Sequence, residues 1–119
     1  AVLFTGVGLA WLVVPWFAAD QFRMALLDGA GRSTQVADLG SFFATLGVCL
    51  GVAAITQRRV WLIPPLLLVG IAAPGRLLAW MAHGAALTWD MIAVEAVLAG
   101  LIVVAWTTSA PGDQRPKSD

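Results

Sequence analysis

Long apolar runs separated by short polar stretches make up most of the chain. Four such runs cover about residues 1–19, 35–56, 60–81 and 88–107. Each approaches the roughly 20 apolar residues that a helix needs to cross a bilayer. A backbone in lipid must satisfy its own hydrogen bonds, and the alternation of a membrane barrel strand is absent. The pattern therefore predicts an all-α fold, namely an integral membrane four-helix bundle with antiparallel up-down topology.

The links between the runs set the domain organisation. Residues 20–34, "DQFRMALLDGAGRST", form a longer loop with a candidate amphipathic helix from Gln21 to Leu27. The other two links are short, so consecutive spans should be antiparallel neighbours. We expect one transmembrane domain over residues 1–108 and a disordered polar tail over 109–119. The first run lacks the basic start of a signal peptide, and we interpret it as a span whose leading residues lie before Ala1.

Composition strengthens the membrane assignment. Of the 119 residues, 60% are hydrophobic and 12% charged, whereas an average soluble domain carries about one quarter charged residues. Seven basic and seven acidic residues give a net charge of zero without a basic stripe, so nucleic acid is not an expected partner. The single cysteine, Cys49, excludes an intrachain disulfide and is expected to be a small core residue. The expected partners are membrane lipids and other integral membrane subunits.

Basic residues near the span ends predict the orientation. Four lie on one side of the predicted bundle and two on the other: Arg58, Arg59, Arg115 and Lys117 against Arg23 and Arg32. Cytoplasmic loops carry the excess of lysine and arginine. We therefore predict a multi-pass protein of the inner (plasma) membrane with both termini in the cytoplasm.

Ionisable residues in or near the spans gather in the outer half of the predicted bundle. They are Asp38, Arg76, His83, Asp90 and Glu95. A charge inside lipid is costly unless it finds a partner or reaches the interface. We predict that Arg76, within the apolar run "GIAAPGRLLAWMAHG", pairs with Glu95, and that Asp38 supplies a second carboxylate to the guanidinium fork. This cluster is either a structural clamp or a pocket for a headgroup, ligand or partner charge. A proton path or catalytic site is a third alternative.

The sequence offers little for catalysis. His83 and the scattered carboxylates lack the spacing of metal ligands, so no metal site is expected. No nucleophile motif, glycine-rich phosphate loop, paired-cysteine motif or haem-binding histidine pair is present. We expect no cofactor and no enzymatic activity.

Small residues recur along the second predicted span. They are Gly40, Ala44, Gly47 and Gly51, and the last two form a GxxxG motif. Such spacing lets two helix backbones approach closely. This helix-packing face serves either the internal bundle or a partner helix.

Several short motifs resemble a known group of proteins. The segments "GVGLAWLVVPWFAAD", "ADLGSFFATLGVCLGVA" and "GRLLAWMAHG", with a glutamate in the last span, resemble small four-span bacterial membrane proteins catalogued as a domain of unknown function. The resemblance covers roughly Gly6 to Trp106. The matching residues are Asp38, Leu39, Gly75, Arg76, Gly84 and Glu95. The arginine expected after Leu39 is Gly40 here, which leaves Asp38 free to pair with Arg76. The resemblance implies a fold and a pattern of polar residues rather than a reaction.

These observations favour a non-catalytic role. The leading expectation is an accessory subunit that stabilises a larger membrane complex, such as a respiratory or oxygenase complex. The alternative is a binder or carrier of a lipid or small hydrophobic molecule that uses Asp38, Arg76 and Glu95. A small transporter is a weaker third reading, since four spans leave little room for alternating access.

Overall fold

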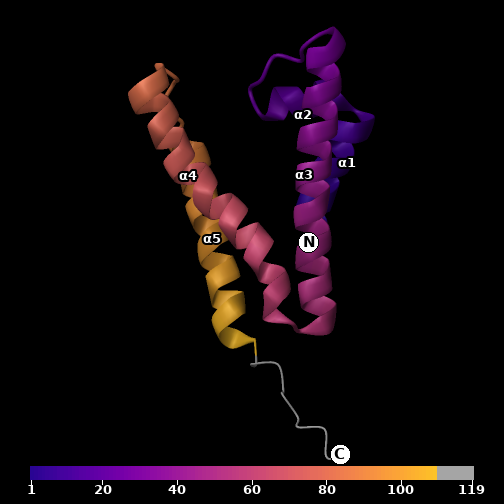
Figure 1. Ribbon diagram of the computed structural model, residues 1–119, viewed down its shortest axis with the longest axis vertical. Coiled ribbons are helices and arrows are strands. Elements are labelled where there is room, and N and C mark those ends of the chain that lie inside the picture. The colour runs from indigo at the N-terminus through magenta and orange to yellow at the C-terminus, as the bar shows by residue number, and fades with distance from the viewer. Residues whose placement is uncertain (110–119) are drawn as a thin grey trace, which may run out of the picture. The chain divides into compact units, whose positions relative to one another are not determined.

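Most of the described part of the chain, residues 1–109, is helical in the computed structural model (Figure 1). In chain order they are α1 (Val2–Val13), α2 (Pro15–Gln21), α3 (Gly29–Thr56), the 3-10 helix η1 (Arg59–Leu62), α4 (Ile63–His83) and α5 (Trp89–Thr108). No strand occurs within residues 1–109. The predicted polar tail, 109–119, lies outside the described residues apart from Ser109.

Three segments of the described chain are long and apolar enough to cross a membrane. They are α3, the continuous stretch of η1 and α4 over Arg59–His83, and α5. Three of the four predicted spans therefore correspond to helices of the required length and composition. The helix α1 is also apolar, but it has only 12 residues.

The prediction of one continuous helix over residues 1–19 is wrong. The backbone breaks at Val14, whose φ of −131° and ψ of 62° are not helical. Pro15 explains the break, because proline lacks an N–H donor and disfavours helical geometry in the residue before it. Pro15 then begins α2, a position that needs no donor. The 12 residues of α1 rise only about 18 Å, short of the roughly 30 Å of a hydrocarbon core.

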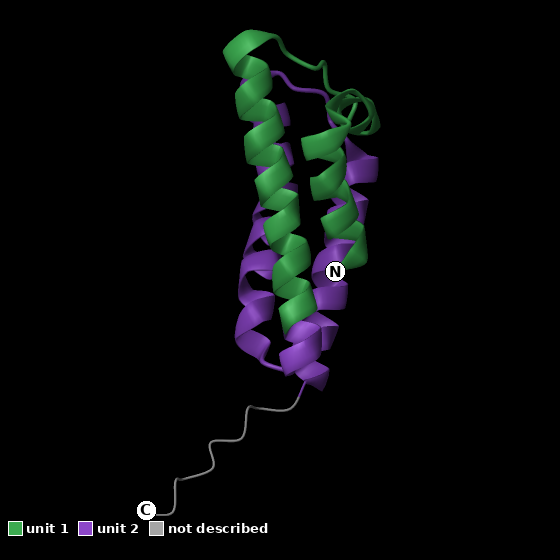
Figure 2. Cartoon of the chain, turned by 90° about the vertical axis from the view of Figure 1, so that its right-hand side faces the viewer, with its two compact units in different colours: residues 1–52 green, residues 53–119 purple. Residues whose placement is uncertain are grey.

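The chain divides into two compact units, residues 1–52 and 53–119 (Figure 2). In the first unit, α1 runs antiparallel to α3, because Thr5 lies against Gly47 and Gly8 against Ala44. Trp11 is fully buried and forms a small core with Ala18 and Ala19 of α2. This core holds α2 in place although α2 has only seven residues.

Aromatic rings extend this core toward α3. The ring centroids of Trp11 and Phe22 are 5.9 Å apart, and those of Phe22 and Phe43 are 5.2 Å apart. The residue Phe22 lies just after α2, where we predicted an amphipathic helix over 21–27. Residues 22–28 form turn and loop instead. The helix α3 begins at Gly29, six residues before the predicted start of the second span.

In the second unit, α4 and α5 form an antiparallel hairpin joined by residues 84–88. Gly84 ends α4 with a φ of +65°, a left-handed conformation that glycine adopts without strain. The amide of Ala85 then closes the helix end by donating to the Ala79 carbonyl at 3.2 Å. Pro65 and Val69 of α4 and Ile102 of α5 are the buried residues of the two helices.

Candidate functional site

The Arg76–Glu95 pair is a polar contact between the two helices of the α4–α5 hairpin. The Arg76 Nε atom donates to Glu95 Oε1 at 2.8 Å. Arg76 lies seven residues before the end of α4, and Glu95 six residues after the start of α5. At about 1.5 Å per residue, both positions lie roughly 10 Å inside the hairpin from its 84–88 end. The antiparallel arrangement therefore brings the two charges to one depth.

The two side chains are unequally covered. The side chain of Glu95 is 13% exposed, whereas that of Arg76 is 33% exposed. The second carboxylate oxygen, Glu95 Oε2, is buried and has no hydrogen-bond partner within the described chain. The contact is thus a single hydrogen-bonded ion pair rather than the two-point fork that arginine and carboxylate often form. The more accessible partner of the pair is therefore the Arg76 side chain.

Helix geometry sets the direction in which the Arg76 side chain leaves α4. The Cα–Cβ bond of a helical residue tilts toward the helix N-terminus. For Arg76, the N-terminus of α4 is the far end of the hairpin, so the tilt leads away from the nearer end at residues 84–88. Glu95 tilts toward that nearer end, because α5 starts there. The Arg76 side chain is therefore directed away from the 84–88 end of the hairpin.

The remaining predicted site residues of the second unit lie at the end of the hairpin. His83 is the last residue of α4 and Asp90 lies in the first turn of α5, and both are exposed. An acidic residue in a first helical turn interacts favourably with the helix dipole, which gives Asp90 a local structural role. Within residues 1–109, no group of three or more histidine, cysteine, aspartate or glutamate side chains is placed to hold a metal ion.

Asp38 belongs to the first unit. It lies in α3 with an exposed side chain, and its backbone carbonyl accepts a hydrogen bond from Ser41 Oγ at 3.2 Å. The pairing of Asp38 with Arg76 stays a prediction.

The small residues of α3 lie at different distances from α1. A Cβ atom on Gly47 would lie 2.6 Å from the backbone nitrogen of Thr5, and one on Gly40 would lie 2.7 Å from Leu12 Cδ2. The backbone of Ala44 meets Gly8 just as closely, with 2.5 Å between the Ala44 nitrogen and a Cβ atom built on Gly8. At Gly51, by contrast, the nearest atom would be Ala1 Cβ at 3.8 Å. Three of the four predicted packing residues therefore contact α1 tightly, and Gly51 does not.

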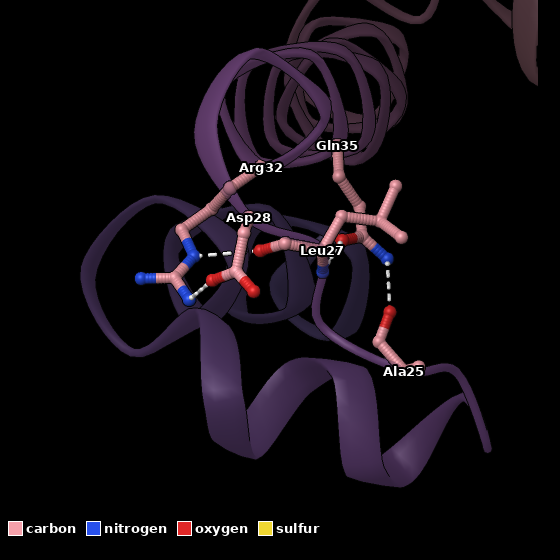
Figure 3. Close-up of polar contacts among 5 residues, drawn as sticks. All are labelled: Ala25, Leu27, Asp28, Arg32 and Gln35. Atoms are coloured by element: carbon pink, nitrogen blue, oxygen red, sulfur yellow. Dashed lines mark hydrogen bonds and ion pairs between the residues drawn. The ribbon is translucent and has the colours of Figure 1, made fainter.

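Sequence reasoning missed Gln35, which fastens the 22–28 loop to α3 (Figure 3). The amide of Leu27 donates to Gln35 Oε1 at 3.0 Å, and Gln35 Nε2 donates to the Ala25 carbonyl at 3.1 Å. Arg32 adds a second attachment, to the Leu27 carbonyl at 2.8 Å and to Asp28 Oδ1 at 2.7 Å. Gln35 is 7% exposed. The sequence feature that could have indicated this contact is a glutamine at the very start of an apolar run.

Comparison with known proteins gives no relative. No protein-family model, no curated protein and no solved structure matches the chain. The resemblance to a four-span family stays a prediction.

Proposed function

We propose that this chain is a multi-pass membrane protein that acts, without catalysis, as an accessory subunit stabilising a larger membrane complex. The observation that carries the proposal is the one-third exposure of Arg76 inside an apolar helix of membrane-crossing length. Of its nitrogens, Nε is engaged by Glu95. A polar group from outside the hairpin would complete the hydrogen bonding of the guanidinium.

A partner helix meets this requirement better than acyl chains do, because acyl chains accept no hydrogen bonds. Polar side chains between membrane helices usually find partners on a neighbouring helix. The helix α5 also presents an apolar stripe at three- and four-residue spacing. Its exposed members are Val94, Val97, Leu101 and Val104. This stripe lies on a different side of α5 from Glu95, so it is a separate surface. The partner helix that meets Arg76 would need a carboxylate or backbone carbonyl at the depth of Arg76.

Native mass spectrometry tests the proposal directly. The tagged full chain is expressed in its own host and extracted in gentle detergent, and the mass of the intact complex is measured. We expect a stoichiometric larger partner with the unchanged chain and its loss with Arg76→Ala. The matched control is Leu78→Ala on the same helix, because Leu78 is 60% exposed and lacks a charge. A monodisperse chain without any partner would contradict the accessory role.

A lipid or small hydrophobic ligand is the second candidate, and one arrangement favours it. Arg76, Trp80 and His83 are spaced by four and three residues, so they lie on one face of α4. Trp80 is 48% exposed, and His83 is exposed at the helix end. Such a face would guide the polar head of a ligand from the interface toward Arg76. A bound small molecule that is lost in Arg76→Ala would support this function, and unchanged ligand content in that variant would exclude it.

A further inference from the structure

We propose that α2 and the 22–28 loop form an interfacial anchor, which lies flat at the boundary between phospholipid headgroups and acyl chains. Its partner is the lipid surface itself, and the proposal is independent of the protein partner suggested above. Four observations on the first unit carry it.

The first observation is the length of α3. Its 28 residues rise about 42 Å, which exceeds the roughly 30 Å of a hydrocarbon core. Its first ten residues, "GAGRSTQVAD", are largely polar or small and include Arg32 and Asp38, whereas residues 39–56 carry no charge. The 18 residues from Leu39 to Thr56 rise about 27 Å, close to the required thickness. The membrane boundary therefore falls near Asp38, and the start of α3 stands above it.

The second observation is the position of α2. In Figure 1 α2 crosses α3 rather than running alongside it, and Figure 2 shows the short helix nearly end-on. Ala18 and Ala19 of α2 belong to the core against which Leu39 and Phe43 of α3 pack. These α3 residues lie just inside the inferred boundary. The break at Val14 thus turns the chain sideways at the level of the membrane surface.

The third observation is the mixture of side chains that α2 exposes. Trp16 is 65% exposed and Phe17 55% exposed, and Asp20 and Gln21 follow within one turn with exposed side chains. Large aromatic residues beside charged groups are typical of the membrane interface, where rings sit at headgroup level. Buried alanines face the protein, so the bulky rings are the outward surface.

The fourth observation is the fixed shape of the loop. Gln35 and Arg32 attach it to the polar start of α3 at four points. Met24 is 42% exposed and Leu27 51% exposed, so the attached loop adds apolar side chains beside α2. A loop held in this way loses little further conformational freedom when it meets lipid.

The charges of this surface indicate which lipid it needs. Asp20 and Asp28 balance Arg23 and Arg32, so no net charge draws the anchor toward anionic headgroups. The apolar side chains, rather than electrostatic attraction, provide the affinity. A zwitterionic bilayer should therefore be sufficient.

Spin-label depth measurements on the full chain test the proposal. With Cys49→Ala as background, a label is placed by Phe17→Cys, Ser33→Cys or Val48→Cys, and each variant is reconstituted into phosphatidylcholine vesicles. Collisions with oxygen and with a water-soluble nickel chelate report depth. We expect position 48 to lie near the bilayer centre, position 33 in water, and position 17 just below the headgroups. Adding phosphatidylglycerol should leave position 17 unchanged.

Two results would overturn the anchor. A label at position 17 as deep as position 48 would mean that α1 and α2 cross the membrane together. A label at position 17 that is as accessible to the nickel chelate as the label at position 33 would mean that α2 lies in water. Such a position is expected of a docking surface for a protein. Gln21→Cys is the second variant for α2, should Phe17→Cys fail to fold as judged by circular dichroism. Its label is expected at headgroup level, between those at 17 and 33, and either extreme contradicts the proposal.

Discussion

The carboxylate of Glu95 belongs to the more deeply buried side chain of the Arg76–Glu95 ion pair, which is 13% exposed against 33% for Arg76. Its second oxygen is buried without a hydrogen-bond partner in the described chain, so Arg76→Ala would leave the whole carboxylate unpaired. We expect this variant to lower the free energy of unfolding by about 2–3 kcal/mol, somewhat less than the removal of one partner from a fully buried pair. Unfolding in mixed micelles with increasing sodium dodecyl sulfate measures the change.

The double variant Arg76→Ala, Glu95→Gln separates a clamp from a binding site. If the two residues serve only each other, removing both should recover part of the lost stability, because no buried charge remains. A double variant as unstable as the sum of the single variants would show that each residue has a separate partner.

A second residue-scale prediction concerns the GxxxG motif. Gly47→Ala would place a Cβ atom 2.6 Å from the Thr5 nitrogen and 2.9 Å from the Thr5 Cα atom, so α1 would have to move away from α3. We expect a loss of stability of about 1–3 kcal/mol, the range for overpacked cores. Thermal unfolding in detergent checks it.

Gly51→Ala is the matched control for this prediction. It adds the same methyl group to the same helix, but the nearest atom would lie 3.8 Å away. We expect a neutral or slightly stabilising effect, since alanine favours helix more than glycine does. Equal destabilisation by both substitutions would show that helix α3 itself, rather than its contact with α1, responds to the added methyl group.

The sequence predicts the pairing of Arg76 but not the role of Gln35. Arg76 and Glu95 are charges in apolar runs on consecutive spans at one depth, and an antiparallel link brings such residues together. The ion pair predicted from this reasoning is present in the structure. The partners of Gln35, by contrast, are backbone groups of a loop eight to ten residues earlier. No side-chain pattern marks backbone groups, so this contact requires the folded chain.

At the scale of elements, Pro15 decides where the first apolar run divides. The change Pro15→Ala restores an amide that can donate to the Trp11 carbonyl, and it removes the restriction on Val14. We expect α1 and α2 to join into a straighter helix and position 17 to move deeper into the bilayer. The spin label at position 17 measures this movement. An unchanged depth would show that the packing of Ala18 and Ala19 against Trp11 maintains the break without the proline.

Hydropathy locates α3, α4 and α5 but misplaces the start of α3. We predicted a start at residue 35, where the apolar run begins, yet the helix starts at Gly29. Two contacts that hydropathy does not register support these six additional residues, namely the Arg32–Asp28 ion pair and the attachment of the loop by Gln35. The helix therefore extends beyond its apolar run at the N-terminal, polar end.

At the scale of the whole molecule, the basic link between α3 and α4 predicts the orientation. Arg58 and Arg59 should lie in the cytoplasm and residues 84–88 outside. In a Cys49→Ala background, Ala86→Cys should react with a membrane-impermeant maleimide in intact cells. Val60→Cys, an exposed position beside the arginines, should react only after the cells are opened. The reverse labelling pattern would contradict the predicted topology.

The short link at residues 84–88 has a consequence for synthesis. Arginine or an acidic residue at the centre of a single inserting helix opposes insertion by roughly 2.5–3.5 kcal/mol. Here the positive charge emerges from the ribosome only 19 residues before the negative one, and the turn at Gly84 folds the second helix back onto the first. We expect the translocation machinery to release α4 and α5 into lipid together, as a neutralised hairpin, rather than one after the other.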